Sequence, residues 1–350
     1  MPAIAGDRQL RVLTQRRKGA ETQVPECFLC DFAPLRLCVE SDPPAARKKM
    51  VSNARLMCYK TFMRKLDSVA GKIHQTDARS FMRELPEASV DLIVCDGPYA
   101  VTTHKWDNVA DIQHFNLELL KSFSRLLKSG GAAYLFGKPD CIDFIDYRAF
   151  LALQSKIVWY QPSRLAQGRI SYTNNYDVIC YFTKGKAKTF NLDDIRVPQL
   201  VELEHRLRCE RVPSVRNGKF GKTVFHPDGK NPGNVWGDIK QLTYKSKELV
   251  SRELLNTIQK PEKLMERLIK ASSNPGDLVF DPFCGSGTVP VVCQRLGRQF
   301  VACEINADYC RIAEERMVKS ANGDGALKNL FEFSTVGRNG HPVISQACLV

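Results

Sequence analysis

The stretch DLVFDPFCGSGT, residues 277–288, decides the fold class of this chain. Its apolar residues predict a buried strand over 277–280, which leads into an acid and a glycine turn. A helix is predicted over 289–296, and a further strand over 299–303 that ends at Glu304. Strand, turn, helix and strand in this order are typical of a parallel α/β sheet, whose ligands bind at the carboxyl ends of the strands.

The same alternation extends toward the N-terminus from this stretch. Further strands are predicted over 72–75, 89–95, 132–136, 156–160 and 177–183. Helices are predicted over 80–85, over 112–127 with an end at Gly130-Gly131, around Leu264 and Leu268 with an end at 274–276, and over 309–317. We therefore expect an α/β domain with a mostly parallel sheet and flanking helices.

Composition sets limits on location and partners. The chain has 350 residues and a formal net charge of +13, which favours a polyanionic partner. No uncharged apolar run approaches the length that a membrane span needs, and residues 1–11 lack the apolar core of a secretion signal. We expect the cytoplasm, or the nucleus in a eukaryote, with most of the 13 cysteines reduced. Cys27, Cys30 and Cys38 resemble only half of a zinc site, so no metal is predicted.

The glycine turn predicts a particular kind of ligand. Gly285 and Gly287 allow the backbone to approach a ligand closely, at a helix N-terminus with free N–H groups. Glu304, 17 positions after Gly287, is placed to accept two ribose hydroxyls. Pro290 stands where a dinucleotide fingerprint has its third glycine, and Asp281 lies just upstream. These residues disfavour a pyrophosphate and favour an adenosyl sulfonium.

A second motif, Asp96-Gly97-Pro98-Tyr99, ends the strand predicted over 89–95. The Asp96 carboxylate and the Gly97 carbonyl can accept both hydrogens of an exocyclic amino group and direct its lone pair toward an electrophilic methyl group. Pro98 restricts the turn, and Tyr99 offers a face on which an extruded base can stack. A packed tyrosine in an Asp-capped turn is the simpler interpretation, but it leaves this combination of residues unexplained.

Residues 191–255 differ from the rest of the domain. Hydrophobic periodicity fades there, and between His205 and Val250 ten Lys and Arg residues stand against four Asp and Glu residues. A long irregular insertion in a compact domain is more often functional than idle. The candidate nucleic-acid-binding residues are Arg206, Arg208, Arg211, Arg216, Lys219 and Lys222.

Residues 260–304 and VDLIVCDGPY, residues 90–99, resemble the AdoMet-dependent DNA amino-methyltransferases, which make N6-methyladenine or N4-methylcytosine. The catalytic motif precedes the glycine turn, with a basic region between them, as in the β class of that family. The resemblance implies a Rossmann-like methyltransferase fold. It also implies a division into an N-terminal extension (1–70), a catalytic half (71–190), a target-recognition insertion (191–255), an AdoMet-binding half (256–320) and a tail (321–350).

The resemblance also implies roles for individual residues. The target-amine site consists of Asp96, Gly97, Pro98 and Tyr99. The AdoMet site consists of Asp77, Lys260, Pro261, Asp281, Phe283, Gly285, Ser286, Gly287, Thr288 and Glu304, with Lys260 and Pro261 beside the methionine end. The chain departs from the family at Gly97, usually proline, at Tyr176-Asp177, usually His-Glu, and at Gln161, usually lysine.

The resulting hypothesis is direct transfer of a methyl group from AdoMet to a base amine in double-stranded DNA. C5-cytosine chemistry is disfavoured because the chain contains no Pro-Cys dipeptide. A leading Asp96 favours adenine N6 over cytosine N4. A catalytically weakened DNA-binding relative and an RNA methyltransferase stay open as alternatives, as does homodimerisation. The sequence predicts neither the recognition site nor an accompanying restriction nuclease.

Overall fold

The computed structural model of the chain describes residues 61, 63–101, 107–162, 172, 174–199, 213–216, 219–222, 226–243, 245–250 and 259–323. Cys27, Cys30 and Cys38 lie outside these ranges, as do Arg206, Arg208 and Arg211. The strands are β1 (Lys72–Gln75), β2 (Val90–Cys95), β3 (Leu127–Gly137), β4 (Ala152–Tyr160), β5 (Tyr176–Thr183), β6 (Pro213–Arg216), β7 (Lys219–Lys222), β8 (Val235–Trp236), β9 (Leu278–Asp281) and β10 (Gln299–Glu304). The helices are α2 (Ala78–Glu84), α3 (Ile112–Leu126), η3 (Asp193–Ile195), α5 (Glu262–Ser272), α6 (Thr288–Arg295) and α7 (Ala307–Gly323).

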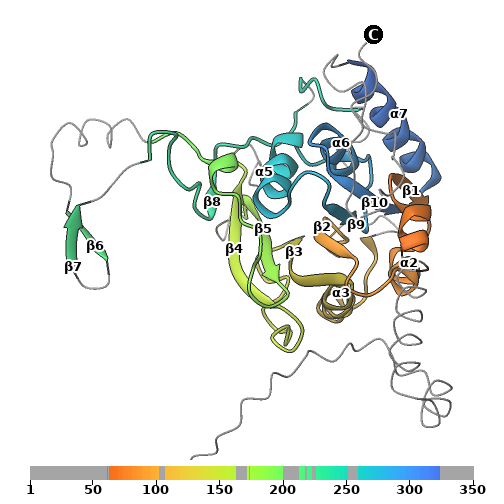
Figure 1. The fold of residues 1–350 in the computed structure, drawn as a ribbon, viewed down its shortest axis with the longest axis horizontal. Helices are drawn as coiled ribbons and strands as arrows, with labels where there is room; N and C mark the ends of the chain where they lie inside the picture. Colours follow the sequence, from red (N-terminus) through yellow and green to blue (C-terminus); the bar gives the residue numbers. More distant parts are fainter. Residues whose placement is uncertain are drawn as a thin grey trace, which may run out of the picture. The chain divides into compact units, whose positions relative to one another are not determined.

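Eight of these strands form one sheet in the order β1-β10-β9-β2-β3-β5-β4-β8 (Figure 1). The first five strands in this order, β1, β10, β9, β2 and β3, run parallel to one another. β6 and β7 pair with each other as a separate antiparallel hairpin. The AdoMet-binding and catalytic halves inferred from the sequence therefore contribute adjacent strands to a common sheet.

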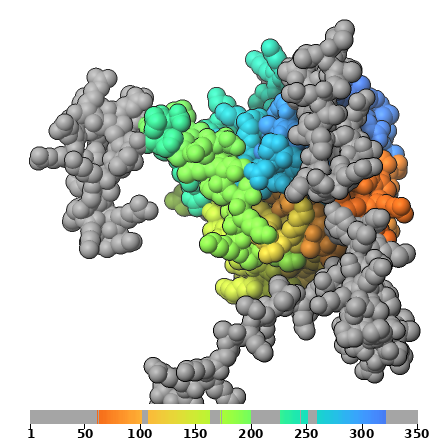
Figure 2. Space-filling model, in the orientation of Figure 1, coloured from red at the N-terminus to blue at the C-terminus, as the bar shows by residue number. Residues whose placement is uncertain are grey.

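Helices cover both faces of the sheet, which explains the continuous apolar run of β2. Ile93 and Cys95 pack on one face with Phe81 of α2 and Phe123 of α3. The alternate residues of β2, Leu92 and Val94, pack on the other face among side chains of α5 and α6. A strand buried on both faces has no polar face to alternate with. Figure 2 shows the described residues of 71–190 (orange to green) directly beside those of 256–320 (blue) on this face of the molecule.

The sheet is mostly parallel, as the sequence predicts, and β5 runs against the other strands of the sheet. β5 is antiparallel to both β3 and β4, whereas β8 at the edge is parallel to β4. No helix is described between β4 and β5 that could act as a crossover. A parallel pair needs such a crossover, usually a helix, whereas an antiparallel pair needs only a turn or loop.

The helix predicted over 112–127 is found as α3, but Gly130-Gly131 do not form its end. α3 ends at Leu126, and β3 begins at the next residue, so both glycines lie inside a strand. A Cβ on Gly131 would stand 2.9 Å from the carbonyl oxygen of Asp91, and Gly130 has φ of 80°. These glycines therefore permit a close backbone approach rather than cap a helix.

Two further observations concern the cysteines and helices of the described residues. The described cysteines, such as Cys95, Cys180 and Cys303, are buried free thiols. Among the helices of the described ranges, none combines the length and the apolar character that crossing a bilayer requires.

Candidate active site

The two motifs singled out in the sequence lie at the carboxyl ends of neighbouring strands. β2 and β9 are paired in parallel, with Leu92 opposite Val279 and Ile93 opposite Phe280. Asp96 directly follows β2, and Asp281 is the last residue of β9. The turns that follow the two strands therefore begin side by side, so the two motifs lie close together in space.

A cavity of about 500 Å³ lies between these turns, within the size range of small-molecule sites. Most of the predicted site residues line it: Asp77, Asp96, Gly97, Pro98, Tyr99, Lys260, Asp281, Phe283, Gly285, Ser286, Thr288 and Glu304. Gly287 and Pro261 are not among the lining residues; they are the N-cap residues of α6 and α5.

Asp96 is the centre of a polar cluster at one end of the cavity. The Tyr99 hydroxyl donates to Asp96 Oδ1 at 2.6 Å. The ammonium of Lys260 lies 2.9 Å from Oδ1 and 2.8 Å from Oδ2. Burial, and then the charge of Asp96, raise the pKa of Tyr99 well above its usual value, so its hydroxyl stays protonated as a donor. Sequence reasoning placed Lys260 beside the cofactor and missed its contact with Asp96.

Asp107, which the sequence analysis did not single out, holds the turn that follows Asp96. Its buried carboxylate accepts the backbone N–H groups of Tyr99 at 2.6 Å, Ala100 at 2.8 Å and Val101 at 2.9 Å. Ala100 has φ of 55°, a region that residues other than glycine seldom adopt. Three charge-assisted hydrogen bonds to one carboxylate therefore maintain a strained turn.

Glu304 connects the glycine turn to the end of β10. Its Oε2 accepts the N–H of Gly285 at 2.9 Å, and its Oε1 accepts the N–H of Asn306 at 2.8 Å. A carboxylate has about four acceptor positions, so Glu304 keeps capacity for hydroxyl donors from a ligand in the cavity. Gly287 has φ of 78°, and a Cβ there would stand 2.5 Å from Ala313 Cβ of α7. Only glycine fits at that position without displacing α7.

The electrostatics of the cavity favour a cationic ligand. Burial raises the pKa of Asp281 well above its usual value, and the charges of Asp96 and Glu304 raise it further, although the N–H of Phe283 opposes this. Burial also raises the pKa of Glu304. A nearby positive charge stabilises the ionised form of such buried carboxylates, so it binds favourably beside them.

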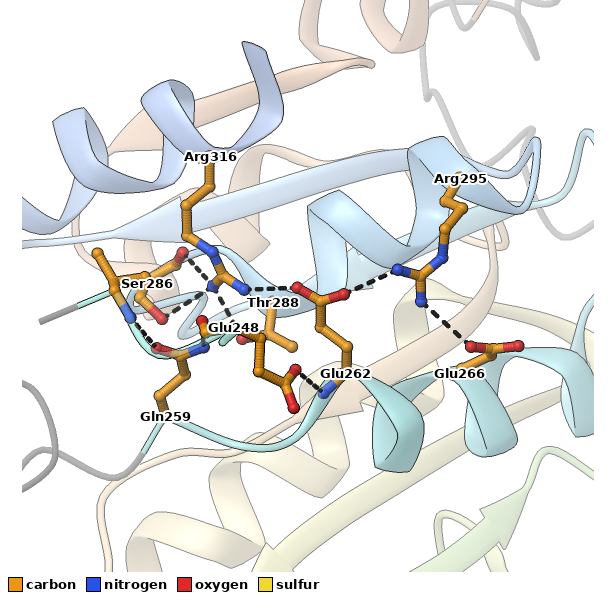
Figure 3. A network of polar contacts seen from close by, with 9 residues as sticks. Glu248, Gln259, Glu262, Glu266, Ser286, Thr288, Arg295 and Arg316 are labelled. Atoms are coloured by element: carbon orange, nitrogen blue, oxygen red, sulfur yellow. Dashed lines mark hydrogen bonds and ion pairs between the residues drawn. The ribbon is translucent and has the colours of Figure 1, made fainter. Parts of the chain in front are cut away.

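An arginine network lies behind the glycine turn, where Arg316 of α7 is buried among polar groups (Figure 3). Its guanidinium donates to the carbonyl oxygen of Ser286 at 2.8 Å, to Thr288 Oγ1 at 3.1 Å and to Glu262 Oε1 at 2.9 Å. Arg295 of α6 donates to the other oxygen of Glu262 at 2.8 Å. Figure 3 shows Glu262 between the two guanidinium groups, so the start of α5 is joined to the glycine turn.

The same network reaches the segment before Lys260. Glu248 accepts the N–H of Glu262 through Oε2 at 2.9 Å, and Gln259 donates to the carbonyl oxygen of Glu248 at 2.8 Å. Both Gln259, directly before Lys260, and Glu262, two residues after it, are thus bonded to Glu248. The chain is therefore held on both sides of Lys260. Sequence reasoning had no signal for Arg316, since its partners lie 28 to 54 positions away.

Asp77 lies at the cavity wall on the β1 side. It caps α2 by accepting the N–H of Ser80 at 3.0 Å, and Phe115 and Ile305 line the cavity with it. Although burial raises the pKa of Asp77, the hydrogen bond from Ser80 and the charge of Arg79 lower it more. An anionic acceptor beside two apolar side chains suits a polar heteroaromatic ring.

A family model described as "DNA methylase" matches residues 90–315, which include both motifs and every strand of the eight-stranded sheet except β1. The chain belongs to the N6/N4 DNA methylase family. It is 32% identical over 245 residues to Type II methyltransferase M1.MboII of Moraxella bovis, covering 68% of this chain and 93% of that protein. It is 35% identical over 259 residues to M.HpaI of Haemophilus parainfluenzae, covering 71% and 74%. It is 33% identical over 250 residues to DNA adenine methyltransferase YhdJ of Escherichia coli K12, covering 69% and 80%.

As an N6/N4 DNA methylase, this protein is an AdoMet-dependent DNA methyltransferase, and its cavity fits that cofactor. AdoMet carries a sulfonium, and the buried carboxylate of Asp281 is a group that a positive charge would stabilise. The volume, the glycine turn and the acceptor Glu304 suit an adenosyl group. In the part of the chain that the structure describes, no group of three or more His, Cys, Asp or Glu residues could hold a metal.

Two of the residues at which the chain departs from the family pattern in the sequence analysis, Gln161 and Asp177, interact with each other. Gln161 Nε2 donates to Asp177 Oδ2 at 2.8 Å, and both side chains are buried. Lys138 lies 3.8 Å from the other oxygen of Asp177 and 5.7 Å from the centre of the Tyr99 ring. Gln161 and Asp177 therefore form a satisfied polar pair at the end of β4 and the start of β5, and Lys138 lies between this pair and Tyr99.

The predicted DNA-binding residues are only partly within the described chain. Arg216 ends β6, and Lys219 and Lys222 begin and end β7, so these three belong to one hairpin. Arg216 and Lys219 are register partners in that hairpin. Arg206, Arg208 and Arg211 lie outside the described residues.

Proposed function

We propose that this methylase transfers the methyl group of AdoMet to N6 of adenine in double-stranded DNA, acting on a base extruded from the duplex. The observation that carries the proposal is the shared cavity of Asp96 and the glycine turn. Adenine is favoured over cytosine by the leading Asp96, as the family resemblance implies. It is also favoured by the name of one relative, a DNA adenine methyltransferase.

Asp96 and Gly97 provide the acceptors of the proposed reaction. The carboxylate of Asp96 and the carbonyl of Gly97 accept the two hydrogens of the target amine and turn its nitrogen lone pair toward the cofactor. The amine proton leaves to Asp96 or to water after the new bond has formed. When bound, AdoMet supplies an electrophilic methyl group, so no covalent intermediate with the base is needed.

Positioning supplies most of the proposed rate enhancement. Asp107 maintains the turn that carries these acceptors, and the ring of Tyr99 offers a stacking face to the base. Glu304 would accept the ribose hydroxyls, and Asp281 would lie near the sulfonium. Fixed groups in a closed cavity need no reorganisation during the transfer step.

Residues 191–255 are the proposed target-recognition insertion. Their excess of basic residues suits contact with phosphates, which provides affinity without reading the sequence. Replacing Lys219 and Lys222 together by alanine should reduce the salt dependence of DNA binding. An unchanged salt dependence would mean that these lysines do not contact DNA.

Mass spectrometry of nucleosides tests the proposed reaction directly. Genomic DNA free of methylation is incubated with the protein and isotope-labelled AdoMet, digested to nucleosides, and sequenced in parallel to locate the modified site. The expected product is labelled N6-methyldeoxyadenosine. N4-methyldeoxycytidine would contradict the choice of base, and unlabelled DNA would favour the DNA-binding alternative. Label in RNA but not in DNA would contradict the substrate.

A further inference from the structure

Lys260 is an unusual residue for the place it occupies. Its side chain is only 2% exposed, yet its ammonium faces the cavity that holds the catalytic motif. Burying an ammonium is costly unless it is paired, and its partner here is the carboxylate of Asp96, at 2.8 and 2.9 Å from the two oxygens. Lys260 is therefore fixed by the same group that the reaction requires.

The ammonium also lies against the ring of the catalytic motif. Lys260 Nζ is 5.2 Å from the centre of the Tyr99 ring and 5.5 Å from that of Phe136, both within cation–π range. A nitrogen that donates to Asp96 beside the Tyr99 ring is what the proposed function requires of the target amine. The ammonium has the donors that the amine would bring, and it uses the same acceptor.

We propose that the ammonium of Lys260 occupies the place of the target amine in the base-free methylase, and that a base enters by displacing it from Asp96. This inference rests on the proposed function, because it takes Asp96 as the acceptor of the amine. Lys260 is then a positioning residue for Asp96. It keeps Asp96 paired until a suitable donor arrives, and its four-carbon stem gives the ammonium room to move.

The exchange would select bases by their hydrogen-bonding groups. An exocyclic amine replaces the donors that Asp96 loses when Lys260 leaves. A carbonyl oxygen in the same position presents an acceptor to a carboxylate, and a bare C–H presents no donor. If either one displaced Lys260, the Asp96 carboxylate would lose the donors of the ammonium without replacement. Leaving a charged group without hydrogen bonds costs more than losing a neutral hydrogen bond. Bases without the amine therefore compete poorly against Lys260.

Binding measurements with two matched duplexes test this exchange. Both duplexes carry the mapped site, one with adenine and the other with purine, which lacks the amino group, at the target position. Dissociation constants are measured for the full-length protein with S-adenosylhomocysteine, so that no transfer occurs. The quantity compared is the ratio of the purine constant to the adenine constant. All contacts outside the target base cancel in this ratio.

The Lys260→Met variant should raise this ratio by about tenfold over wild type, because adenine no longer has to displace an ammonium from Asp96. The matched control is Lys263→Met, which alters an exposed lysine of the same helix and should leave the ratio unchanged. A structural role for Lys260 would change both constants equally. An unchanged or lower ratio in Lys260→Met would overturn the proposal.

A second measurement does not depend on the folding of a variant. Crystal structures of the wild-type protein with each duplex should show the Lys260–Asp96 contact broken when adenine occupies the cavity and intact with purine. Persistence of that contact beside an adenine in the cavity would also refute the exchange. If the wild-type protein methylates cytosine, the proposed choice of adenine is wrong, but the exchange of Lys260 can still be tested. The two duplexes then carry cytosine and 2-pyrimidinone, which lacks the amino group, at the target position.

Discussion

Phe283, in the turn after β9, lies against Gly97, in the turn after β2. A Cβ on Gly97 would stand 3.2 Å from Cδ2 and 3.3 Å from Cε2 of the Phe283 ring. The loop proposed to hold the methyl acceptor and the loop proposed to hold the methyl donor are thus in direct contact. The small size of glycine allows this approach, which a larger residue would obtain only by moving the ring.

Position 97 is usually proline in the family that the chain resembles, and a glycine there should loosen the turn that begins at Asp96. The Asp107 carboxylate accepts three consecutive backbone N–H groups of that turn. We expect this acid from outside the turn to supply part of the rigidity that a proline would give.

Asp107→Asn should therefore lower kcat at least tenfold and change the affinity for AdoMet by less than about threefold. The amide nitrogen of asparagine cannot accept, so it leaves at least one N–H of the turn without its partner. Steady-state kinetics and equilibrium binding of AdoMet measure the two effects. Asp140→Asn, at an exposed position, is the control and should match wild type. Equal losses of turnover and of cofactor binding would contradict this role.

Asp96→Ala should abolish methyl transfer while AdoMet still binds. The variant removes the acceptor of the target amine and leaves the glycine turn and Glu304 in place. It also leaves the ammonium of Lys260 without its carboxylate, so a lower melting temperature is expected as well. Incorporation of labelled methyl groups and calorimetric titration of AdoMet test the two statements. Turnover at the wild-type level would exclude Asp96 from the reaction.

The affinity for AdoMet should fall as the pH is lowered, and the fall should begin above the ordinary pKa of about 4 for a carboxyl group. Burial raises the pKa values of Asp281 and Glu304, so these groups take up protons in the cofactor-free protein before exposed acids do. The sulfonium favours their ionised forms, and protonation therefore opposes its binding. The affinity for S-adenosylhomocysteine, whose sulfur is neutral, should depend less on pH. Parallel curves for the two ligands would show that the charge at sulfur is not sensed.

Arg316→Ala should raise the dissociation constant for AdoMet by roughly tenfold and destabilise the fold by about 3 kcal/mol. It removes the donors to Ser286, Thr288 and Glu262, so the glycine turn loses its connection to α5 and α7. Arg316→Lys keeps the charge but not the several directed contacts, and an intermediate effect is expected. Arg311→Ala, on the exposed side of the same helix, should behave like wild type. Cofactor affinity at the wild-type level in Arg316→Ala would show that the turn is rigid without the network.

Local sequence patterns predicted the central part of this fold. The apolar runs before Asp96 and before Asp281 are strands, and the turn with Gly285 and Gly287 leads into α6, because strand, glycine and helix signals are short in range. Asp96, Asp281 and Glu304 are placed at the cavity because they stand at the ends of predicted strands, whereas Asp77 and Lys260 were indicated only by the family resemblance.

Long-range contacts account for what sequence reasoning missed. The pairing of Lys260 with Asp96 joins residues 164 positions apart, and no local pattern indicates it. Gly130 and Gly131 carry the same signal as a helix end, but in the fold Gly131 allows the close approach of β3 to Asp91 of β2, and Gly130 that of β3 to Lys186 and Lys188. The direction of β5 is a matter of its pairing with β3 and β4 across the sheet, which no local pattern indicates.

The segment 198–229, inside the proposed target-recognition insertion, begins and ends at one point of the domain. Val197 and Lys230 form an isolated antiparallel bridge, and the Arg196 guanidinium donates to the carbonyl oxygen of Gly229 at 3.0 Å. Segments joined in this way tolerate changes of length at little cost in loop entropy. We therefore expect that 198–229 can be exchanged for a segment of another length without moving the strands that carry Asp96 and Asp281.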